Sequence, residues 1–260
     1  TTRNDSLTSF SSPAIKAIVT LFMFFSATNM AVVYYAFKRN FGKIRENSEF
    51  RFYLIIIAIF SLLVIIALLV LEGKPFFESV QDGIFHVVSI ISTTGFYTTD
   101  FTAWGNFAML TLFILMFTGG TTGSAAGGVK ITRLIIMTSN NRMELRRLIH
   151  PEAYIPVRLN RKIVPHNIVY NVLVYITLYF IVMCASAVII SVMGYDVITS
   201  FGTSASMLAN IGPGLGMFGP FHTYEMMPVA GKYFLAILMF LGRLEMMAVL
   251  ILFSRSFYRR

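Results

Sequence analysis

The sequence predicts an all-α integral membrane protein built from repeats of a span, a re-entrant pore half-helix, a glycine-bearing turn and a second span. Three observations predict this class: 56% apolar but only 13% charged residues, long apolar stretches between basic loops, and an internal repeat. So little polar material cannot cover a soluble core of 260 residues. The single cysteine, Cys184, excludes a disulfide framework and a cysteine-based metal site.

Five transmembrane spans are expected, because a spanning helix needs about 20 predominantly apolar residues. Four stretches reach this length unaided: residues 14–37, 53–71, 168–193 and 233–257. A fifth, residues 107–118, is too short alone and runs into GGTTGSAAGGVK before apolar sequence resumes at Ile131. Two shorter stretches, residues 78–91 and 197–208, suit half-helices that enter the membrane without crossing it, which gives two pore helices.

The basic residues lie on one side of this predicted arrangement. Sixteen of the 21 Lys and Arg residues fall within residues 38–51, 130–162 and 255–260. The positive-inside rule places these segments in the cytoplasm, together with the C-terminus, and the acidic loops outside. Topology and anionic lipid headgroups explain the net charge of +9 better than nucleic-acid binding does. We therefore expect a multi-pass protein of the inner or plasma membrane.

An internal repeat divides the chain. LFILMFTGG at residues 112–120 matches LAILMFLGR at residues 235–243 in six of nine positions, and SIISTTGF at residues 89–96 aligns with SMLANIGP at residues 206–213. We expect one pore repeat over residues 49–150, with a broken second helix, and another over residues 151–260. TLFMFF, which begins at Thr20, resembles TLFILMF, which begins at Thr111. Residues 1–48 are thus expected to hold the last helix of an earlier repeat and a cytoplasmic loop, with more repeats before Thr1.

The two glycine-bearing turns predict a cation pathway. Irregular backbone at membrane depth is tolerated where it is buried in protein or lines a water-filled cavity. Gly95 and Gly212 allow the backbone to turn successive carbonyl oxygens toward one axis, where they replace a cation's hydration shell. The hydroxyls of Thr93 and Thr94 and the amide of Asn210 add oxygens or brace the turns. The C-terminal ends of the half-helices favour a cation nearby, and dehydration by carbonyl rings favours K+ over Na+.

These motifs together resemble the C-terminal half of a TrkH-type potassium uptake subunit of the Trk/Ktr/HKT superfamily. The resemblance covers essentially the whole chain and includes STTGF, GGTTGSAAGGVK, NIGPGLG and LGRLE. It implies four repeats around one pore, of which the N-terminal half is missing here, and K+ as the transported ion. It also implies filter carbonyls from Thr93, Thr94, Gly95, Asn210, Ile211 and Gly212. Because Asn-Ile-Gly-Pro replaces Thr-Thr-Gly in the second turn, the two turns are not equivalent.

The glycine-rich run invites two interpretations. It is either a small-residue surface for close helix packing or a mobile gate beneath the filter, and the resemblance supports the gate. The gate residues are Gly119, Gly120, Gly123, Gly127, Gly128 and Arg243. Arg243 lies about 17 Å along the last helix from Lys232, near the middle of the membrane. It either forms a structural ion pair, for which Glu245 is poorly placed, or repels cations and restrains the loop, as the family implies.

The sequence is compatible with three functions. The first is a K+-conducting pore subunit, and the second is a secondary transporter that couples solute or K+ movement to Na+ or H+. The third is a structural membrane subunit. Repeats that begin on the same side favour the pore, and the filter-like turns argue against the third. We expect no enzyme activity and no covalently bound cofactor. The resemblance implies a homodimer and a cytosolic nucleotide-binding regulator of the TrkA or KtrA kind, docked on the basic loops.

Overall fold

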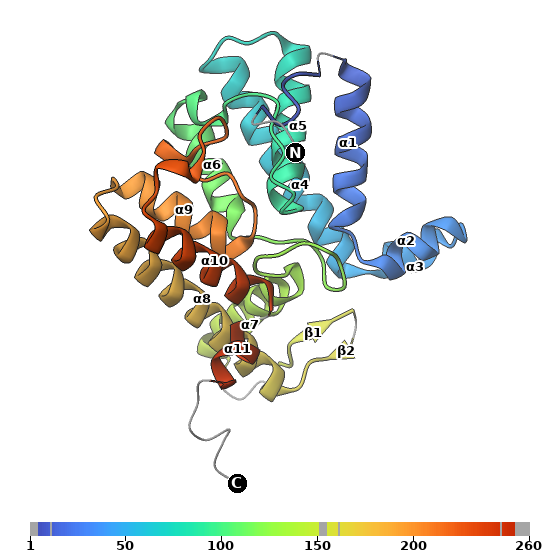
Figure 1. Ribbon diagram of the computed structural model, residues 1–260. Coiled ribbons are helices and arrows are strands. Elements are labelled where there is room, and N and C mark those ends of the chain that lie inside the picture. The colour runs from blue at the N-terminus through green and yellow to red at the C-terminus, as the bar shows by residue number, and fades with distance from the viewer. Residues whose placement is uncertain (1–4, 11, 151–154, 161, 245, 253–260) are drawn as a thin grey trace.

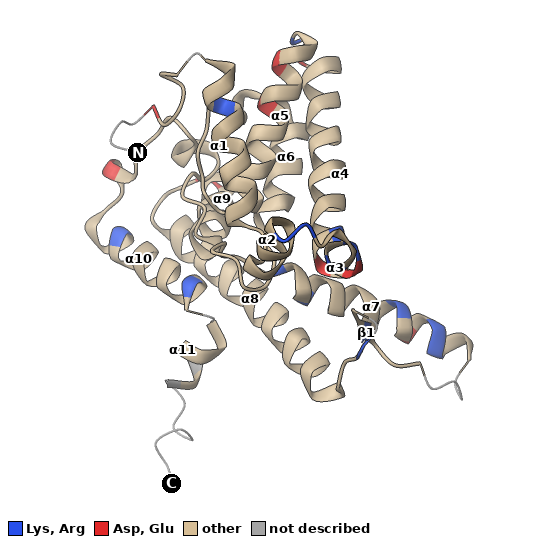
Figure 2. Cartoon of the chain, turned by 90° about the vertical axis from the view of Figure 1, so that its right-hand side faces the viewer, with Lys and Arg blue, Asp and Glu red and all other residues tan. Residues whose placement is uncertain are grey.

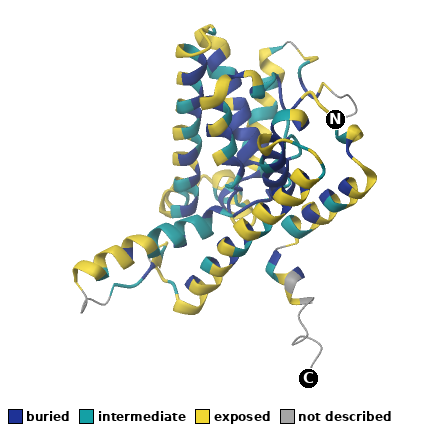
Figure 3. Cartoon of the chain, turned by 90° about the vertical axis from the view of Figure 1, so that its left-hand side faces the viewer, coloured by how far each residue is buried: buried dark blue, intermediate teal, exposed yellow. Residues whose placement is uncertain are grey.

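Two helices at the centre of the molecule lead to the two glycine-bearing turns. They are α5 (Phe76–Ile91) and α9 (Val197–Ala209), and each of them packs against several other helices (Figure 1). Their last turns are buried, and Figure 3 shows the buried residues concentrated in this region. The structure is a computed structural model that describes residues 5–10, 12–150, 155–160, 162–244 and 246–252. Helices over residues 78–91 and 197–208 are confirmed, and their role as pore helices stays a prediction.

Each central helix packs against an outer helix before it and a shorter helix after it. In the first repeat, α4 (Ser48–Val70) packs against α5 and against α6 (Gly105–Met116). In the second, α8 (His166–Val192) packs against α9, which also contacts α10 (Val229–Arg243). α1 (Pro13–Ser26) packs on α5 as α6 packs on α9. The shorter helix of one unit thus covers the central helix of the next, as a repeated architecture requires.

Fewer helices are long enough to cross a membrane than the sequence predicts. Within the described residues, α4 and α8 qualify by length and composition, and a third span results if α1 and α2 (Met30–Phe37) are counted together. These two helices are bent by 114° relative to each other. A continuous helix over residues 14–37 is therefore wrong. The chain breaks before Asn29, whose side-chain oxygen caps α2 by accepting a hydrogen bond from the Ala31 N–H at 2.8 Å.

The last apolar stretch is also interrupted. The expected continuous helix over residues 233–257 ends at Arg243, and α11 (Met246–Leu252) follows as a separate helix. Glu245 and residues 253–260, which include the basic C-terminal end, lie outside the described residues. The short fifth stretch forms α6, which ends at Met116, and the chain becomes helical again in α7 (Ile131–Ile149). The predicted break in this helix is confirmed.

The charged residues separate toward opposite ends of the molecule. Basic residues gather around α7, α3 (Phe41–Glu46) and β1 (Arg158–Leu159), which pairs with β2 (Lys162–Ile163) in an antiparallel turn (Figure 2). Acidic residues gather at the far end, beside the start of α5, although Lys16 pairs with Asp82 there at 3.9 Å and Glu46 lies among the basic residues of α3. The basic end contains segments that the positive-inside rule assigns to the cytoplasm, and the acidic end contains loops that it assigns to the outside.

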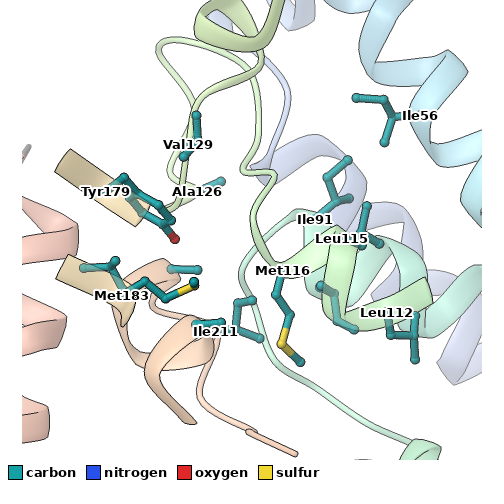
Figure 4. Packing of buried hydrophobic residues seen from close by; sticks show 14 of the residues in the cluster. Ile56, Ile91, Leu112, Leu115, Met116, Ala126, Val129, Tyr179, Met183 and Ile211 are labelled. Atoms are coloured by element: carbon teal, nitrogen blue, oxygen red, sulfur yellow. The ribbon is translucent and has the colours of Figure 1, made fainter. Parts of the chain in front are cut away.

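The apolar core lies directly behind the two glycine-bearing turns. Figure 4 shows Ile91 at the end of α5, Met116 at the end of α6 and Ile211 in the second turn within one cluster. Tyr179 and Met183 of α8 complete the cluster from the outer side. Close packing of this kind holds the irregular backbone of the turns in place.

Candidate ion pathway

The two turns have positive φ angles at the same two positions. Thr93 and Asn210, which are equivalent in the repeat, have φ angles of 53° and 60°, and the equivalent Gly95 and Gly212 have φ angles of 72° and 110°. Left-handed backbone is unfavourable for a β-branched residue such as Thr93, so the surrounding structure must hold it there. The same unusual conformation at both equivalent positions indicates a shared structural role.

The hydrogen bonds of the turns repeat as well. The N–H of Thr94 donates to the Ser89 carbonyl oxygen at 3.0 Å, and the N–H of Ile211 donates to that of Ser206 at 2.9 Å. Ser206 also accepts a hydrogen bond on its hydroxyl from the N–H of Gly212 at 3.1 Å. Because the turns direct these N–H groups back to the helix ends, carbonyl oxygens are the backbone groups they can offer to a ligand. Such a surface suits a cation rather than an anion.

The turns contact each other directly. A Cβ atom added at Gly95 would overlap the carbonyl oxygen of Ile211 and lie 2.9 Å from Cδ of Pro213. A Cβ atom at Gly212 would meet nothing within 4 Å, so only the backbone conformation favours glycine there. Glycine is thus required at position 95 by the close approach of Ile211 as well as by the positive φ angle. The structure brings together two turns that are far apart in the sequence.

The polar side chains of the turns brace the backbone. Thr93 Oγ1 accepts a hydrogen bond from the Gly127 N–H at 2.7 Å, and Thr94 Oγ1 lies 2.8 Å from Ser92 Oγ. Asn210 Nδ2 donates to the Met239 carbonyl oxygen at 3.0 Å. The sequence allows these groups either to add oxygens to an ion site or to brace the turns. The observed contacts support bracing.

The aromatic residue Tyr224, which no pattern in the sequence marks, also supports the second turn. Tyr224 donates from its hydroxyl to the Gly212 carbonyl oxygen at 3.0 Å, and its ring stacks on Phe218 with centroids 4.6 Å apart. Tyr224 lies in a short 3-10 turn with no motif around it. A sequence signal does exist for the serines of the turns, since Ser89 and Ser206 occupy equivalent positions in the aligned repeats.

The glycine-rich run folds into a loop against both turns. Its two ends pair through the Gly119 N–H, which donates to the Val129 carbonyl oxygen at 2.8 Å. Gly119, Gly120, Gly127 and Gly128 are buried, whereas Gly123 at the tip is exposed. A Cβ atom at Gly127 would overlap the carbonyl oxygen of Ala209, the last residue of α9. The loop therefore touches the first turn through Thr93 and the second through the end of α9.

Two side chains from other parts of the chain, together with Lys130 at the end of the run, anchor the loop. Asn29, at the α1–α2 break, donates from Nδ2 to the Thr122 carbonyl oxygen at 2.6 Å. The buried carboxylate of Glu49 accepts hydrogen bonds from the Thr122 N–H and from the Thr132 hydroxyl, both at 2.5 Å. Lys130 donates to the carbonyl oxygens of Ser124, at 3.3 Å, and of Ala126. No pattern in the sequence marks Asn29, Glu49 or Lys130 as anchors of the loop.

Arg243 reaches the loop from the last residue of α10. Its Nη1 donates to the Ala125 carbonyl oxygen at 2.8 Å, although the two residues are 118 positions apart. Ala125 is itself tied to α1, because its N–H donates to the Ser26 carbonyl oxygen at 3.1 Å. The predicted gate residues thus lie together, with the arginine bound to the exposed part of the loop.

Comparison with known proteins identifies the family. The model of the TrkH family, described as a cation transport protein, matches residues 1–258. The chain belongs to the TrkH family. It is 31% identical over 260 residues to the Trk system potassium uptake protein TrkH of Halomonas elongata, covering 100% of this chain and 54% of that protein. It is 32% identical over 263 residues to TrkH of Escherichia coli K12, covering 99% of this chain and 53% of that protein.

A solved TrkH-family structure has the same fold. The crystal structure of the potassium transporter TrkH from Vibrio parahaemolyticus matches with a TM-score of 0.90 at 30% identity, over 100% of this chain and 56% of that one. The chain spans about half the length of the TrkH relatives it matches. TrkH-family membership and the apolar helices together make this a multi-pass membrane protein.

Proposed function

We propose that this chain supplies half of a K+-conducting pore, in which backbone carbonyl oxygens at two turns contribute to one selectivity filter. The proposed filter residues are Thr93, Thr94, Gly95, Asn210, Ile211 and Gly212. The observation that carries the proposal is the repeated left-handed backbone at equivalent positions of two turns in contact. The relatives named as potassium uptake proteins and the potassium transporter support K+ as the ion. The remaining carbonyl groups would come from repeats that precede this sequence.

The glycine-rich loop and Arg243 would gate this pathway. The loop lies against both turns, and the positive charge of Arg243 is bound to it. A cation that passes a fixed guanidinium group in a narrow pore meets electrostatic repulsion. Release of Arg243 from Ala125 would move both the loop and the charge.

The partners and the orientation follow from the same proposal. The basic segments over residues 38–51 and 130–162 would face the cytoplasm of a cell whose inner or plasma membrane holds the protein, with the C-terminus on the same side. Residues 130–162 would dock a cytosolic regulator of the TrkA or KtrA kind, and two complete pores would form a homodimer.

The proposed filter is tested by adding a Cβ atom at each glycine of the complete transport protein. Gly95→Ala and Gly212→Ser should lower the ratio of K+ to Na+ uptake into proteoliposomes, and Gly95→Ala should have the larger effect because it also meets Ile211. Gly194→Ala is the matched control, since Gly194 has a φ angle of 96°, meets nothing within 4 Å and lies at the end of α8. An unchanged uptake ratio in both filter variants would remove these turns from the selectivity filter.

A further inference from the structure

A basic hollow lies between the start of α4, α3, α7 and β1. It measures about 600 Å³, and its lining includes Arg45 of α3, Arg51 of α4 and Arg158 of β1. Hydrogen bonds hold its walls together, because Asn160 Oδ1 accepts from the N–H of Ser48 at 2.8 Å. Figure 2 shows these elements side by side among the basic residues of the molecule. Three different elements thus bring guanidinium groups to one concave surface.

Among the described residues that line this hollow, positive side chains outnumber negative ones. Glu46 is the one acidic side chain among its described lining residues, against three arginines. The ion pairs observed between described residues, Lys16–Asp82 and Arg147–Glu144, do not include an arginine of the hollow. An anion with several oxygens would relieve the repulsion between these groups, and guanidinium groups bind phosphate oxygens well. The chemistry of the hollow therefore suits a phosphate group.

The surface next to the hollow distinguishes a lipid from a free phosphate. Along α4, the exposed residues that follow Arg51 on the same face are apolar and continue for nearly the whole helix: Ile55, Ile59, Leu62 and Ile66. α4 is one of the two helices long and apolar enough to cross a membrane on its own. A phospholipid placed with its phosphate in the hollow would lay its acyl chains along this stripe.

Neighbouring aromatic residues place the hollow at the level of the headgroups. α2 and α3 lie across the direction of α4 and are seen nearly end-on beside its start in Figure 2. They expose Tyr34, Phe37 and Phe41, whose exposed fractions reach 85% at Phe37. Aromatic residues and lysines are typical of a membrane interface, and Lys38 Nζ lies 4.8 Å from the centre of the Tyr34 ring.

From this arrangement we infer that the hollow binds the phosphate of an anionic phospholipid headgroup at the cytoplasmic surface of the membrane. The three arginines supply the charge and the exposed face of α4 supplies the surface for the acyl chains. This site is separate from the filter and the loop, so its test does not depend on ion flux.

The test uses the complete transport protein in detergent and measures bound lipid by native mass spectrometry. Phosphatidylglycerol is titrated against the wild type and a double variant, Arg51→Gln with Arg158→Gln, with phosphatidylcholine as the neutral reference. We expect the double variant to lower the affinity for phosphatidylglycerol about 30-fold, since each arginine near an anionic surface contributes about fivefold. Arg147→Gln is the matched control, because Arg147 lies on α7 outside the hollow and pairs with Glu144 at 3.1 Å. This control should bind like the wild type.

Two further measurements test whether the hollow binds an anionic lipid. If the double variant does not fold, as judged by gel filtration, Arg45→Gln alone should still lower the affinity about fivefold. Inorganic phosphate is added as a competitor, and the inference expects it to leave phosphatidylglycerol bound. Equal lipid binding by the wild type and the arginine variants would overturn the site. Complete displacement by phosphate, or equal binding of phosphatidylcholine, would overturn its assignment to an anionic lipid.

Discussion

Replacing Arg243 by Gln should raise the rate of ion uptake through the complete pore. The wild-type guanidinium donates to the Ala125 carbonyl oxygen at 2.8 Å and thereby holds the exposed part of the loop against the end of α10. Glutamine is shorter and uncharged, so it loses both this contact and the positive charge. Both losses favour the conducting state, because one frees the loop and the other removes repulsion from the pathway.

The size of the effect follows from the hydrogen bond. A bond from a charged donor contributes about 1.5–3 kcal/mol when buried. Arg243 is exposed in the structure, so solvent screening reduces this to about 1 kcal/mol. A loop that is mostly closed would then open about fivefold more often, since about 1.4 kcal/mol corresponds to a factor of ten. Removal of the charge acts in the same direction.

The assay is Rb+ uptake into proteoliposomes, normalised to the amount of folded protein. Arg243→Lys keeps the charge without the planar guanidinium and should give an intermediate rate. Lys232→Gln is the control: Lys232 lies in the same helix and donates to the Glu225 carbonyl oxygen at 2.9 Å, far from the loop. A variant at Arg243 with reduced thermal stability and equal or lower flux would instead show a structural role, and would refute the gate.

Three further expectations concern the loop, helix α9 and the topology. Glu49→Ala should lower the melting temperature and raise Rb+ flux, because it leaves two donors without their acceptor, whereas Glu49→Gln keeps an acceptor oxygen and should do neither. The hydrogen bond with Thr199 lowers the pKa of Asp196, the residue before α9. The ionised Asp196 carboxylate therefore stabilises the folded protein above the usual aspartate pKa, and this stabilisation is lost as the pH falls through the lowered pKa. Melting temperatures measured down to about pH 3 should therefore fall more steeply for the wild type than for Asp196→Asn, and parallel curves would contradict this. A cysteine introduced at Arg146, with Cys184 replaced by Ser, should resist an impermeant external reagent in intact cells, and labelling would reverse the predicted topology.

The elements that the sequence predicts are those whose signal is local. The half-helix over residues 78–91 is bounded by Pro75 before it and by STTGF after it, and the observed helix α5 begins two residues earlier. The break after Met116 is visible because glycine, serine and alanine replace the apolar residues. The proposed filter residues of the two turns come together at equivalent ends of two helices, as the repeat in the sequence predicts.

The features that the sequence did not predict depend on contacts between distant residues. Residues 14–37 are apolar enough for one span, although polar Ser26, Thr28 and Asn29 interrupt them. The chain bends at Ala27, whose carbonyl oxygen accepts a hydrogen bond from the Thr121 N–H of the loop at 2.9 Å. Glu49 resembles an ordinary acidic residue in the first turn of a helix until the loop is placed beside it. Such contacts join residues more than 70 positions apart, so they cannot be predicted from hydropathy or from spacing along the chain.

The hydrogen bond between Thr93 and Gly127 makes two equilibria interdependent. Thr93 belongs to the first turn and Gly127 to the loop, and the bond is 2.7 Å long. Any ligand that binds the turn more tightly when this bond is intact must, by reciprocity, favour the loop position that keeps it intact, and by the same factor. If the turn is the proposed filter and the loop the proposed gate, ion occupancy of the turn and the position of the loop are linked thermodynamically, so the concentration of the permeant ion would itself act as an effector of the gate.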